Sequence, residues 1–291
     1  SAGIPRWMPD RSSPILFTDE MQWQLQATYK KSRTDYQRQA FGGGGLKKKK
    51  VRTDQITLTL FDPTEEITPD DLLQKRLAKG KGLSGGALLF TQRNAKWLLY
   101  DGANNFHFAE KNWSGTVSFW LKVDPINELD PGYVDPIQIT PNTWNDASFF
   151  VDFNKEGKPR DFRLGCFADK KVWNPGGGEV PETERPLLTS KNPGFAPGKW
   201  VHVLFTWENF NSGKKDAVAK LYLNGTLNGT LDGWNQQFTW KPTETARLLL
   251  GLNYIGLMDD FACFNRALTA EEVKQIYLMK DGLGALLGGD S

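Results

Sequence analysis

The chain has 291 residues, of which 36 are Lys or Arg and 34 are Asp or Glu, so its formal net charge at pH 7 is +2. Such a balanced charge creates no global field that would make a nucleic acid or an acidic polymer an obligatory partner. No stretch approaches the roughly 18 consecutive apolar residues of a membrane-spanning helix, so we expect no membrane span. The 29 Gly, 16 Pro and 11 Trp residues, with short apolar alternations between turn residues, are typical of one large all-β sandwich.

Residues 1–54 differ from the rest of the chain and predict an N-terminal arm. Residues 21–29 alternate between apolar and polar side chains, which is a strand period, although a helix with its apolar stripe running from Met21 to Ala40 fits as well. We favour the strand. Four glycines at 42–45 and four lysines at 47–50 then form a hinge followed by concentrated positive charge. This basic run is either a solvated tether or part of an arm held by a partner subunit, a neighbouring copy or an anionic surface.

Two features bear on the cellular compartment. The sequence begins Ser-Ala-Gly-Ile-Pro, with neither an initiator Met nor a charged and apolar leader. We interpret it as a processed form and expect an exported protein, periplasmic, on the cell surface or extracellular. Cys166 and Cys263 both lie in strand-like stretches, and a pair this far apart is either a disulfide or two buried thiols. The sequence leaves both alternatives open.

The body of the chain begins near residue 55. Residues 56–61 alternate as a strand, and the Thr-Pro-Asp-Asp sequence at 68–71, with leucines after it, predicts a short helix. Residues 82–90 and 112–123 then form two further strand-like stretches.

The middle of the chain combines loops with a hairpin. Long loops rich in Pro and Gly are expected at residues 130–143 and 172–197, and such loops at the rim of a rigid sandwich are places where binding is expected. Residues 198–207 predict another strand. Residues 220–223 predict the next one, which the Asn-Gly turn at 224–225 ends.

The segment 256–282 joins a half-buried strand to a capped helix. Met258 and Ala262 fall on one face of the extended strand and Cys263 falls on the other, so both faces carry apolar residues. Thr269 with Glu272 three residues later forms a capping-box pattern that opens a helix over 270–280. Gly282 is placed to end this helix.

These stretches resemble the laminin G-like, or concanavalin A-like, jelly-roll modules. The closing strand and helix, the opening pair at 82–90 and 112–123, and the central hairpin occur in that family's order, and the resemblance covers about residues 56–282. It implies an all-β, two-sheet antiparallel jelly-roll sandwich with a short C-terminal helix at 55–282, after an N-terminal extension at 1–54 and before a tail at 283–291. The family includes lectins, adhesion modules, enzyme-appended modules and a few catalytic members, so the fold does not choose among functions.

Catalytic patterns are missing from the sequence. The chain has only two histidines, His107 and His202, and no metalloprotease, nucleophile-elbow, Cys-x-x-Cys or P-loop spacing. The paired acids that concanavalin-like hydrolases carry on one strand are also absent. We therefore expect a protein that is not an enzyme. The alternative is a polysaccharide lyase or hydrolase on the same scaffold, which a cluster such as His107 with Tyr100 or Tyr133 in one cleft would favour.

The resemblance also suggests a structural Ca²⁺, because many similar modules hold one with oxygen ligands from their first and last strands. Asp259 matches the first acidic position of the closing motif, and Asp62 at the end of the first strand could face it. The alternative is that Asp259 caps a turn or pairs with Arg266 or a lysine.

Tryptophans outside the family's strand motifs are the candidates for ligand contact, since an exposed indole stacks on sugar rings or fills a protein interface. Trp173 is the first choice, and the others are Trp144, Trp234 and Trp240. We therefore expect a non-catalytic binding or assembly module, which holds a glycan or a protein partner through its rim loops and through the arm at 1–54.

Overall fold

The computed structural model describes residues 49–52, 57–60, 77–78, 80–83, 85–93, 98–240, 246–279 and 282–283. Several predictions from the sequence lie outside these residues: the strand or helix at 21–29, the glycine hinge, Asp62, the body of the helix near 68–77 and the tail beyond Leu283.

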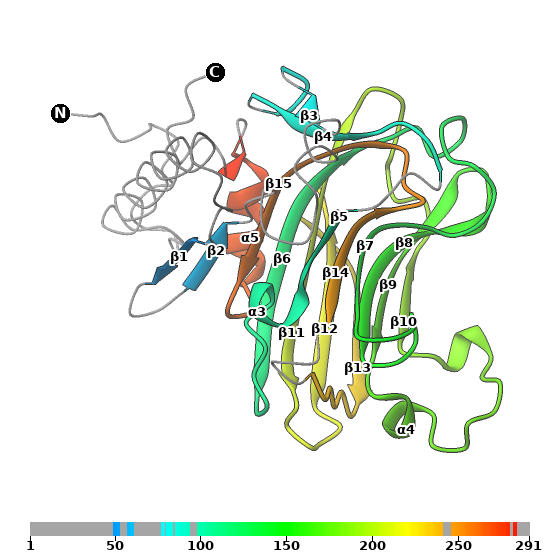
Figure 1. Cartoon of the computed structure of the whole chain (residues 1–291), viewed down its shortest axis with the longest axis vertical. Helices are drawn as coiled ribbons and strands as arrows, with labels where there is room; N and C mark the ends of the chain where they lie inside the picture. Colours follow the sequence, from blue (N-terminus) through cyan, green and yellow to red (C-terminus); the bar gives the residue numbers. More distant parts are fainter. Residues whose placement is uncertain are drawn as a thin grey trace, which may run out of the picture.

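The described chain is mostly strands in two antiparallel sheets, which confirms the predicted jelly-roll sandwich (Figure 1). The larger sheet runs in the order β1 (Lys49–Arg52), β2 (Thr57–Leu60), β15 (Gly256–Phe264), β6 (Trp113–Lys122), β11 (Trp200–Phe210), β12 (Ala217–Leu223) and β13 (Thr226–Trp234), with β3 (Leu77–Ala78) and β4 (Ala87–Phe90) attached at β15. The smaller sheet runs in the order β10 (Leu187–Ser190), β9 (Arg160–Phe167), β8 (Ser148–Gly157), β7 (Val134–Thr140), β14 (Arg247–Leu252) and β5 (Leu98–Asp101). The helices within the described residues are α3 (Gly102–Asn105), α4 (Lys170–Trp173), the 3₁₀ turn η1 (Glu182–Glu184) and α5 (Ala270–Tyr277).

Aromatic rings fill the space between the two sheets. Trp113 of β6 lies at the centre of this cluster, with ring centroids 5.0 Å from Trp240, 5.2 Å from Trp207 and 5.4 Å from Phe149. Its indole nitrogen donates a hydrogen bond of 3.0 Å to the carbonyl of Phe106, so its polar atom is satisfied in the core. Edge-to-face contacts of this kind add to the free energy gained by removing the rings from water.

The alternation predicted along the closing strand β15 is wrong beyond its middle, because a β-bulge interrupts it. Asp259 and Ala262 are three positions apart but pair with residues of β6 that are only two apart. Asp260 in the bulge has a φ of 57°, a left-handed conformation that Asp tolerates better than most residues. The bulge exchanges the faces of the residues after it, so that Cys263 and not Ala262 joins the core between the sheets.

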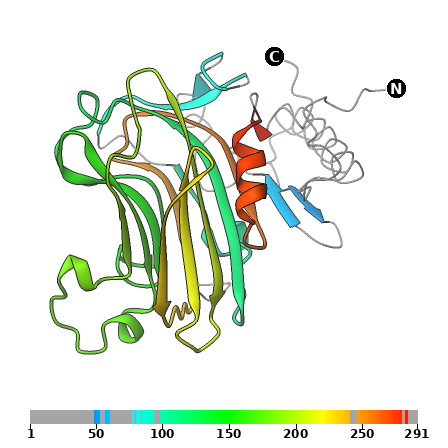
Figure 2. The same ribbon diagram turned by 180° about the vertical axis from the view of Figure 1, so that it is seen from behind.

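The helix α5 confirms the predicted capping box. The backbone N–H of Glu272 donates to Thr269 Oγ1 at 3.3 Å, and the backbone N–H of Thr269 donates to Glu272 Oε2 at 2.9 Å. The helix lies against the outer face of the larger sheet (Figure 2). There the Tyr277 ring packs 5.9 Å from Trp120 and 6.1 Å from His202. Those two residues are buried beneath it.

Two predicted loops contain strands of the smaller sheet. The stretch 130–143 includes β7, although Pro136 lies inside the strand, and 172–197 includes β10. Proline has no N–H to donate and is confined in sheets to edges and irregular positions. The pairing of β7 with β8 shifts register between Val134 and Ile137, which places Pro136 at such an irregularity. At the start of the described chain, Lys49–Arg52 of the predicted arm pair with β2 in the larger sheet.

Cys166 and Cys263 are buried thiols and are not joined in a disulfide, which decides between the two alternatives that the sequence left open. Burial raises the pKa of the Cys166 thiol well above its ordinary value. Both residues are therefore apolar core side chains. In the part of the chain that the structure describes, no helix is long and apolar enough to cross a bilayer.

Candidate functional site

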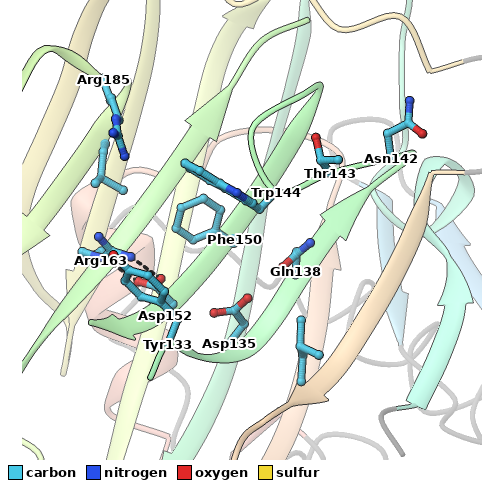
Figure 3. A pocket seen from close by; sticks show the side chains of 12 residues that line it. Tyr133, Asp135, Gln138, Asn142, Thr143, Trp144, Phe150, Asp152, Arg163 and Arg185 are labelled. Carbon is cyan, nitrogen blue, oxygen red and sulfur yellow. Dashed lines mark hydrogen bonds and ion pairs between the residues drawn. The ribbon is translucent and has the colours of Figure 1, made fainter. Parts of the chain in front are cut away.

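A pocket of about 470 Å³ opens on the outer face of the smaller sheet (Figure 3). Alternation along the strands creates it: in β8, Phe149 and Val151 point into the core, so Phe150 and Asp152 point outward. The pocket draws its lining from β7, β8, β9, β10 and β14 and from the loops beside them. The lining residues are Tyr133, Asp135, Gln138, Asn142, Thr143, Trp144, Phe150, Asp152, Arg163, Arg185, Leu187 and Leu252.

Aromatic side chains form one wall of the pocket. Phe150 stacks on Phe167 with ring centroids 5.7 Å apart, and Trp144 meets Phe167 edge-on at 5.3 Å. The Phe150 ring lies where a Cβ on Gly165 would come within 2.3 Å of it, so only glycine at this position of β9 lets the ring lie flat on the sheet. Trp144 remains 44% exposed and presents apolar surface to the pocket.

Hydrogen bonds from neighbouring residues fix the loop that carries Trp144. The Ser148 hydroxyl donates to the Trp144 carbonyl, and the indole nitrogen of Trp173 donates to the Asn145 carbonyl at 2.9 Å. The guanidinium of Arg185 lies 5.8 Å from the centroid of the Trp144 ring and donates through Nε to the Val180 carbonyl. Trp144 is thus exposed on a loop that hydrogen bonds fix at several points.

An ion pair spans the pocket floor between two neighbouring strands. Asp152 and Arg163 are directly opposite in the β8–β9 pairing, and the guanidinium donates to both carboxylate oxygens, at 2.8 Å from Nε and 2.5 Å from Nη2. The two side chains are only 4% and 7% exposed. Arg163 also bonds to Glu182 at 3.1 Å through Nη1. Burial opposes the charge of Arg163, but the bonds and charge of Asp152 outweigh it and raise the pKa of the guanidinium.

Tyr133 covers the ion pair from the pocket side. Its ring lies 4.7 Å from the Arg163 guanidinium, and it is 42% exposed. The turn just before it is fixed by the buried Arg160, which donates to the carbonyls of Asp130 and Gly132 at 2.7 Å each. The position of Tyr133 is therefore set by the fold.

Asp135, next to Tyr133 at the start of β7, has no such partner. Its Oδ1 atom is shielded from solvent and makes no hydrogen bond. Burial, followed by the negative charge of Asp152, raises the pKa of this carboxyl well above its ordinary value, against the weaker effects of Arg163 and Arg93. The pocket thus holds one carboxyl in an ion pair and one that favours its neutral form.

The structure separates the four predicted contact tryptophans. Trp144 lies on the pocket wall, whereas Trp173 is half-buried beneath the neighbouring loop and Trp234 is half-buried in β13 of the other sheet. Trp240 is only 1% exposed and packs against Trp113 in the core. The prediction that Trp240 contacts a ligand is therefore wrong: its loop position in the sequence does not keep its ring from packing into the core.

The predicted calcium ligand Asp259 is engaged in backbone contacts. Its Oδ2 accepts from the N–H of Leu83 at 2.7 Å, and its Oδ1 accepts from the N–H of Asp260 at 2.8 Å. Burial raises its pKa to about 6, against these two bonds. These donors compete with a cation for the same oxygens, so the contacts of Asp259 do not favour calcium. Among the described residues, no group of three or more His, Cys, Asp or Glu side chains is placed to hold a metal ion.

The residues named for the enzyme alternative are also dispersed. Tyr133 lines the pocket, whereas Tyr100 is buried in the core and His107 follows α3, away from the pocket lining. His202 is buried beneath α5, where burial lowers its pKa to about 3, so it is a packed structural residue.

The sequence did not single out Asp135, Asp152 or Arg163. A usable signal exists for the last two, because the alternating apolar residues of 148–153 and 162–167 flank a turn and define a hairpin. Pairing the inward residues of this hairpin places Asp152 opposite Arg163 on the outer face. No comparable signal marks Asp135, since the prolines near it predict a loop.

Comparison of the fold with solved structures gives many matching chains, and three of them, at 12–14% sequence identity, illustrate the likeness. Domain 4 of an extracellular arabinanase from Geobacillus stearothermophilus, in complex with arabinotriose, is 14% identical, with 79% of this chain and 81% of that one covered and a TM-score of 0.35. The CBM40 of a Ruminococcus gnavus IT-sialidase, bound to α2,3 sialyllactose, is 13% identical, with 66% and 95% covered and a TM-score of 0.43. A Trypanosoma rangeli sialidase is 12% identical with a TM-score of 0.44, and the match covers 78% of this chain but 30% of the sialidase.

At the level of sequence, no curated protein is significantly similar to the chain. A family model does match: its description is concanavalin A-like lectin/glucanases superfamily, and it covers residues 100–274, from β5 to the middle of α5. This is more than half of the chain, and it contains every residue that lines the pocket. The chain therefore belongs to the concanavalin A-like lectin/glucanase superfamily.

Proposed function

We propose that the protein is a carbohydrate-binding module that takes a sugar chain in the pocket on the outer face of the smaller sheet. The observation that carries the proposal is the combination of an exposed, fixed indole, Trp144, with polar side chains around one opening. Sugar rings have apolar faces and hydroxyl edges. An aromatic wall with a few directional polar groups complements both.

The polar groups supply both donors and acceptors. Gln138 and Asn142 each carry an amide that donates and accepts, Thr143 and Tyr133 carry hydroxyls, and Arg185 carries donors only. Sugar hydroxyls also donate and accept, so several can be bound at once. The hydrogen bonds would set orientation and specificity, while the contact area with Trp144 would supply most of the affinity.

Export and assembly belong to the same proposal. Polymeric glycans are encountered outside the cytoplasm, so we place the protein in the periplasm, at the cell surface or outside the cell. The arm at 1–54 would attach it to a partner subunit. Mass measurement of the full chain and of a version starting at residue 54 tests this part: a multimer that becomes a monomer on trimming supports the arm, and two monomers contradict it.

Binding measurements test the glycan proposal. Calorimetry against cello-, xylo-, arabino- and galacto-hexaose should identify at least one ligand. Trp144→Ala should weaken its binding by about tenfold or more, equivalent to about 1.4 kcal/mol, without unfolding the protein. Trp234→Ala is the matched control, because Trp234 is half-buried in β13 and outside the pocket. Equal affinities of the wild-type and Trp144→Ala proteins would contradict the assignment, as would binding to none of the four sugars.

A glycan-cleaving enzyme is the second candidate, and the pocket offers a specific observation for it. Asp135 favours its protonated form beside Tyr133, as a general acid requires. Asp152 is less suited to act as the second carboxylate, because Arg163 engages both of its oxygens. Release of new reducing ends or unsaturated products from the same sugars, abolished by Asp135→Asn and retained by Asp232→Asn on β13, would establish catalysis. No product at high protein concentration would reject it.

A further inference from the structure

The basic side chains of the pocket do not pair with all of its carboxyl groups. Arg163 donates its hydrogen bonds to Asp152 and Glu182. Arg185 lies over Trp144, and its Nε donates to a backbone carbonyl. Asp135 is the lining carboxyl for which the described residues provide no hydrogen bond or ion pair, and its Oδ1 is shielded from solvent.

This carboxyl is half-buried, with Oδ1 shielded from solvent, and it has two ways to avoid an unpaired charge there. It can meet a cation, or it can keep its proton and remain neutral. Arg163, the cation with the larger effect on Asp135, is already neutralised by Asp152, whose own charge repels a second carboxylate. A neutral carboxyl is also a hydrogen-bond donor, which an ionised one is not.

We propose that Asp135 keeps its proton in the empty pocket and donates a hydrogen bond from it to an oxygen of the bound sugar. This inference rests on the proposed function and adds a specificity-determining residue to it. The ligand must present an acceptor at this point, such as a hydroxyl or ring oxygen. An ammonium group there has no lone pair to offer, so a free amino sugar fits the neutral carboxyl poorly.

Every charged or titratable group that faces Asp135 bears on the pH dependence. Asp152 faces it from β8, Arg163 from β9, Tyr133 from the start of β7, and Arg93 from the turn after β4, where its Nη1 donates to the Tyr133 carbonyl at 3.4 Å. The arginines favour ionisation of Asp135, whereas burial and Asp152 oppose it. Binding should therefore weaken as the pH rises through the pKa of Asp135.

The proton can be observed without any ligand. Carbon-13 NMR of the aspartate carboxyl carbons, with Asp135→Asn to assign the signal, should show that Asp135 titrates well above the reference aspartate pKa of about 4. Titration at that reference value would overturn the inference while leaving the glycan-binding proposal intact.

The donor role is tested with the tightest-binding member of the neutral hexasaccharide panel. Wild-type affinity should fall by about tenfold from pH 5 to pH 9. In Asp135→Asn, whose amide donates at every pH, this fall should disappear; in Asp135→Ala, affinity should be low throughout. Asp232→Asn, an exposed change on β13, should behave as wild type.

The outcomes separate the two claims. Affinity that rises or stays constant as Asp135 ionises would overturn the donor role. Preference for a glucosamine hexamer over cellohexaose that is lost in Asp135→Asn would also overturn it, because it would show Asp135 acting as an anion. Binding of no panel member would reject the glycan proposal and the donor role, and the NMR titration would still decide whether Asp135 holds its proton.

Discussion

The two outer faces of the sandwich carry similar residues but differ in what covers them. On the larger sheet, Trp120 and His202 lie beneath Tyr277 of α5, and His202 Nε2 pairs with the Ser118 hydroxyl at 2.9 Å. On the smaller sheet, Trp144 and the unpaired Asp135 face an open pocket. An aromatic residue beside a polar one thus builds a packing surface on one face and a binding surface on the other.

The element that covers each face, and not the type of residue on it, therefore decides which face is available for binding. The amphipathic α5 places Val273 and Ile276 against its sheet and excludes water there. At the pocket, the neighbouring loops cover Trp144 only in part, so its side chain remains half-exposed.

Loss of Arg163 should have the largest effect, because it leaves Asp152 buried without a counter-ion. Breaking one side of a buried pair costs about 3–5 kcal/mol, so Arg163→Met should lower the free energy of unfolding by that amount in urea titrations. The double variant Arg163→Met with Asp152→Leu should recover much of the loss. A double variant that is as unstable as the single one would show that the ion pair is not the cause.

Tyr277→Ala would uncover the opposite face. Removing this half-buried ring, which packs on Trp120 and His202, should lower the free energy of unfolding by about 2–3 kcal/mol. This is somewhat less than the loss expected for a fully buried aromatic residue. Glycan affinity should be unchanged because the pocket lies on the other sheet. Leu278→Ala provides the matched control. The neighbouring Leu278 is 61% exposed, so its truncation should change the free energy of unfolding little. A similar loss in both variants would contradict the covering role of Tyr277.

The covered face should also make the fold sensitive to acid. His202 has a folded pKa of about 3 and an unfolded pKa of about 6.5. Below pH 6.5, His202 is therefore protonated in the unfolded chain but stays neutral in the native state. Its contribution to stability is full above pH 6.5 and is lost as the pH falls. From pH 6.5 to pH 5 the expected loss is about 2 kcal/mol. His202→Gln should lack this part of the decline, and parallel pH curves for the two proteins would argue against it.

The smallest effect is expected from Gly165→Ala in the pocket wall. The new Cβ would meet the Phe150 ring at 2.3 Å, so the ring must tilt away from the sheet into the pocket. We expect a stability loss of about 1 kcal/mol, at the low end of overpacking changes, together with weaker sugar binding. Unchanged affinity in calorimetry would mean that Phe150 does not border the bound ligand.

Local signals were enough to predict much of the fold. The capping box at Thr269 and the Asn-Gly turn at 224–225 depend on residues close in sequence, and both occur as expected. The bulge at Asp260 was missed, since only the pairing with β6 reveals the extra residue.

The candidate site was less accessible from the sequence because its residues come together only across strands. Trp144 stood out as a loop tryptophan, but the same criterion selected Trp240, which packs in the core. Asp135 was hidden in a stretch that Pro136 made look like a loop. Its chemistry depends on burial and on Asp152, seventeen positions away, and neither is written in the local sequence.

The anchors of β15 determine how the module presents its pocket. Asp260 accepts a hydrogen bond from the N–H of Leu283, and β2 pairs with β15 near the start of the described chain. The described chain therefore begins and ends at the larger sheet (Figure 1). The pocket opens on the outer face of the smaller sheet (Figure 3). Several such modules in a row could then engage one polymer together, and their avidity would exceed the affinity of a single pocket.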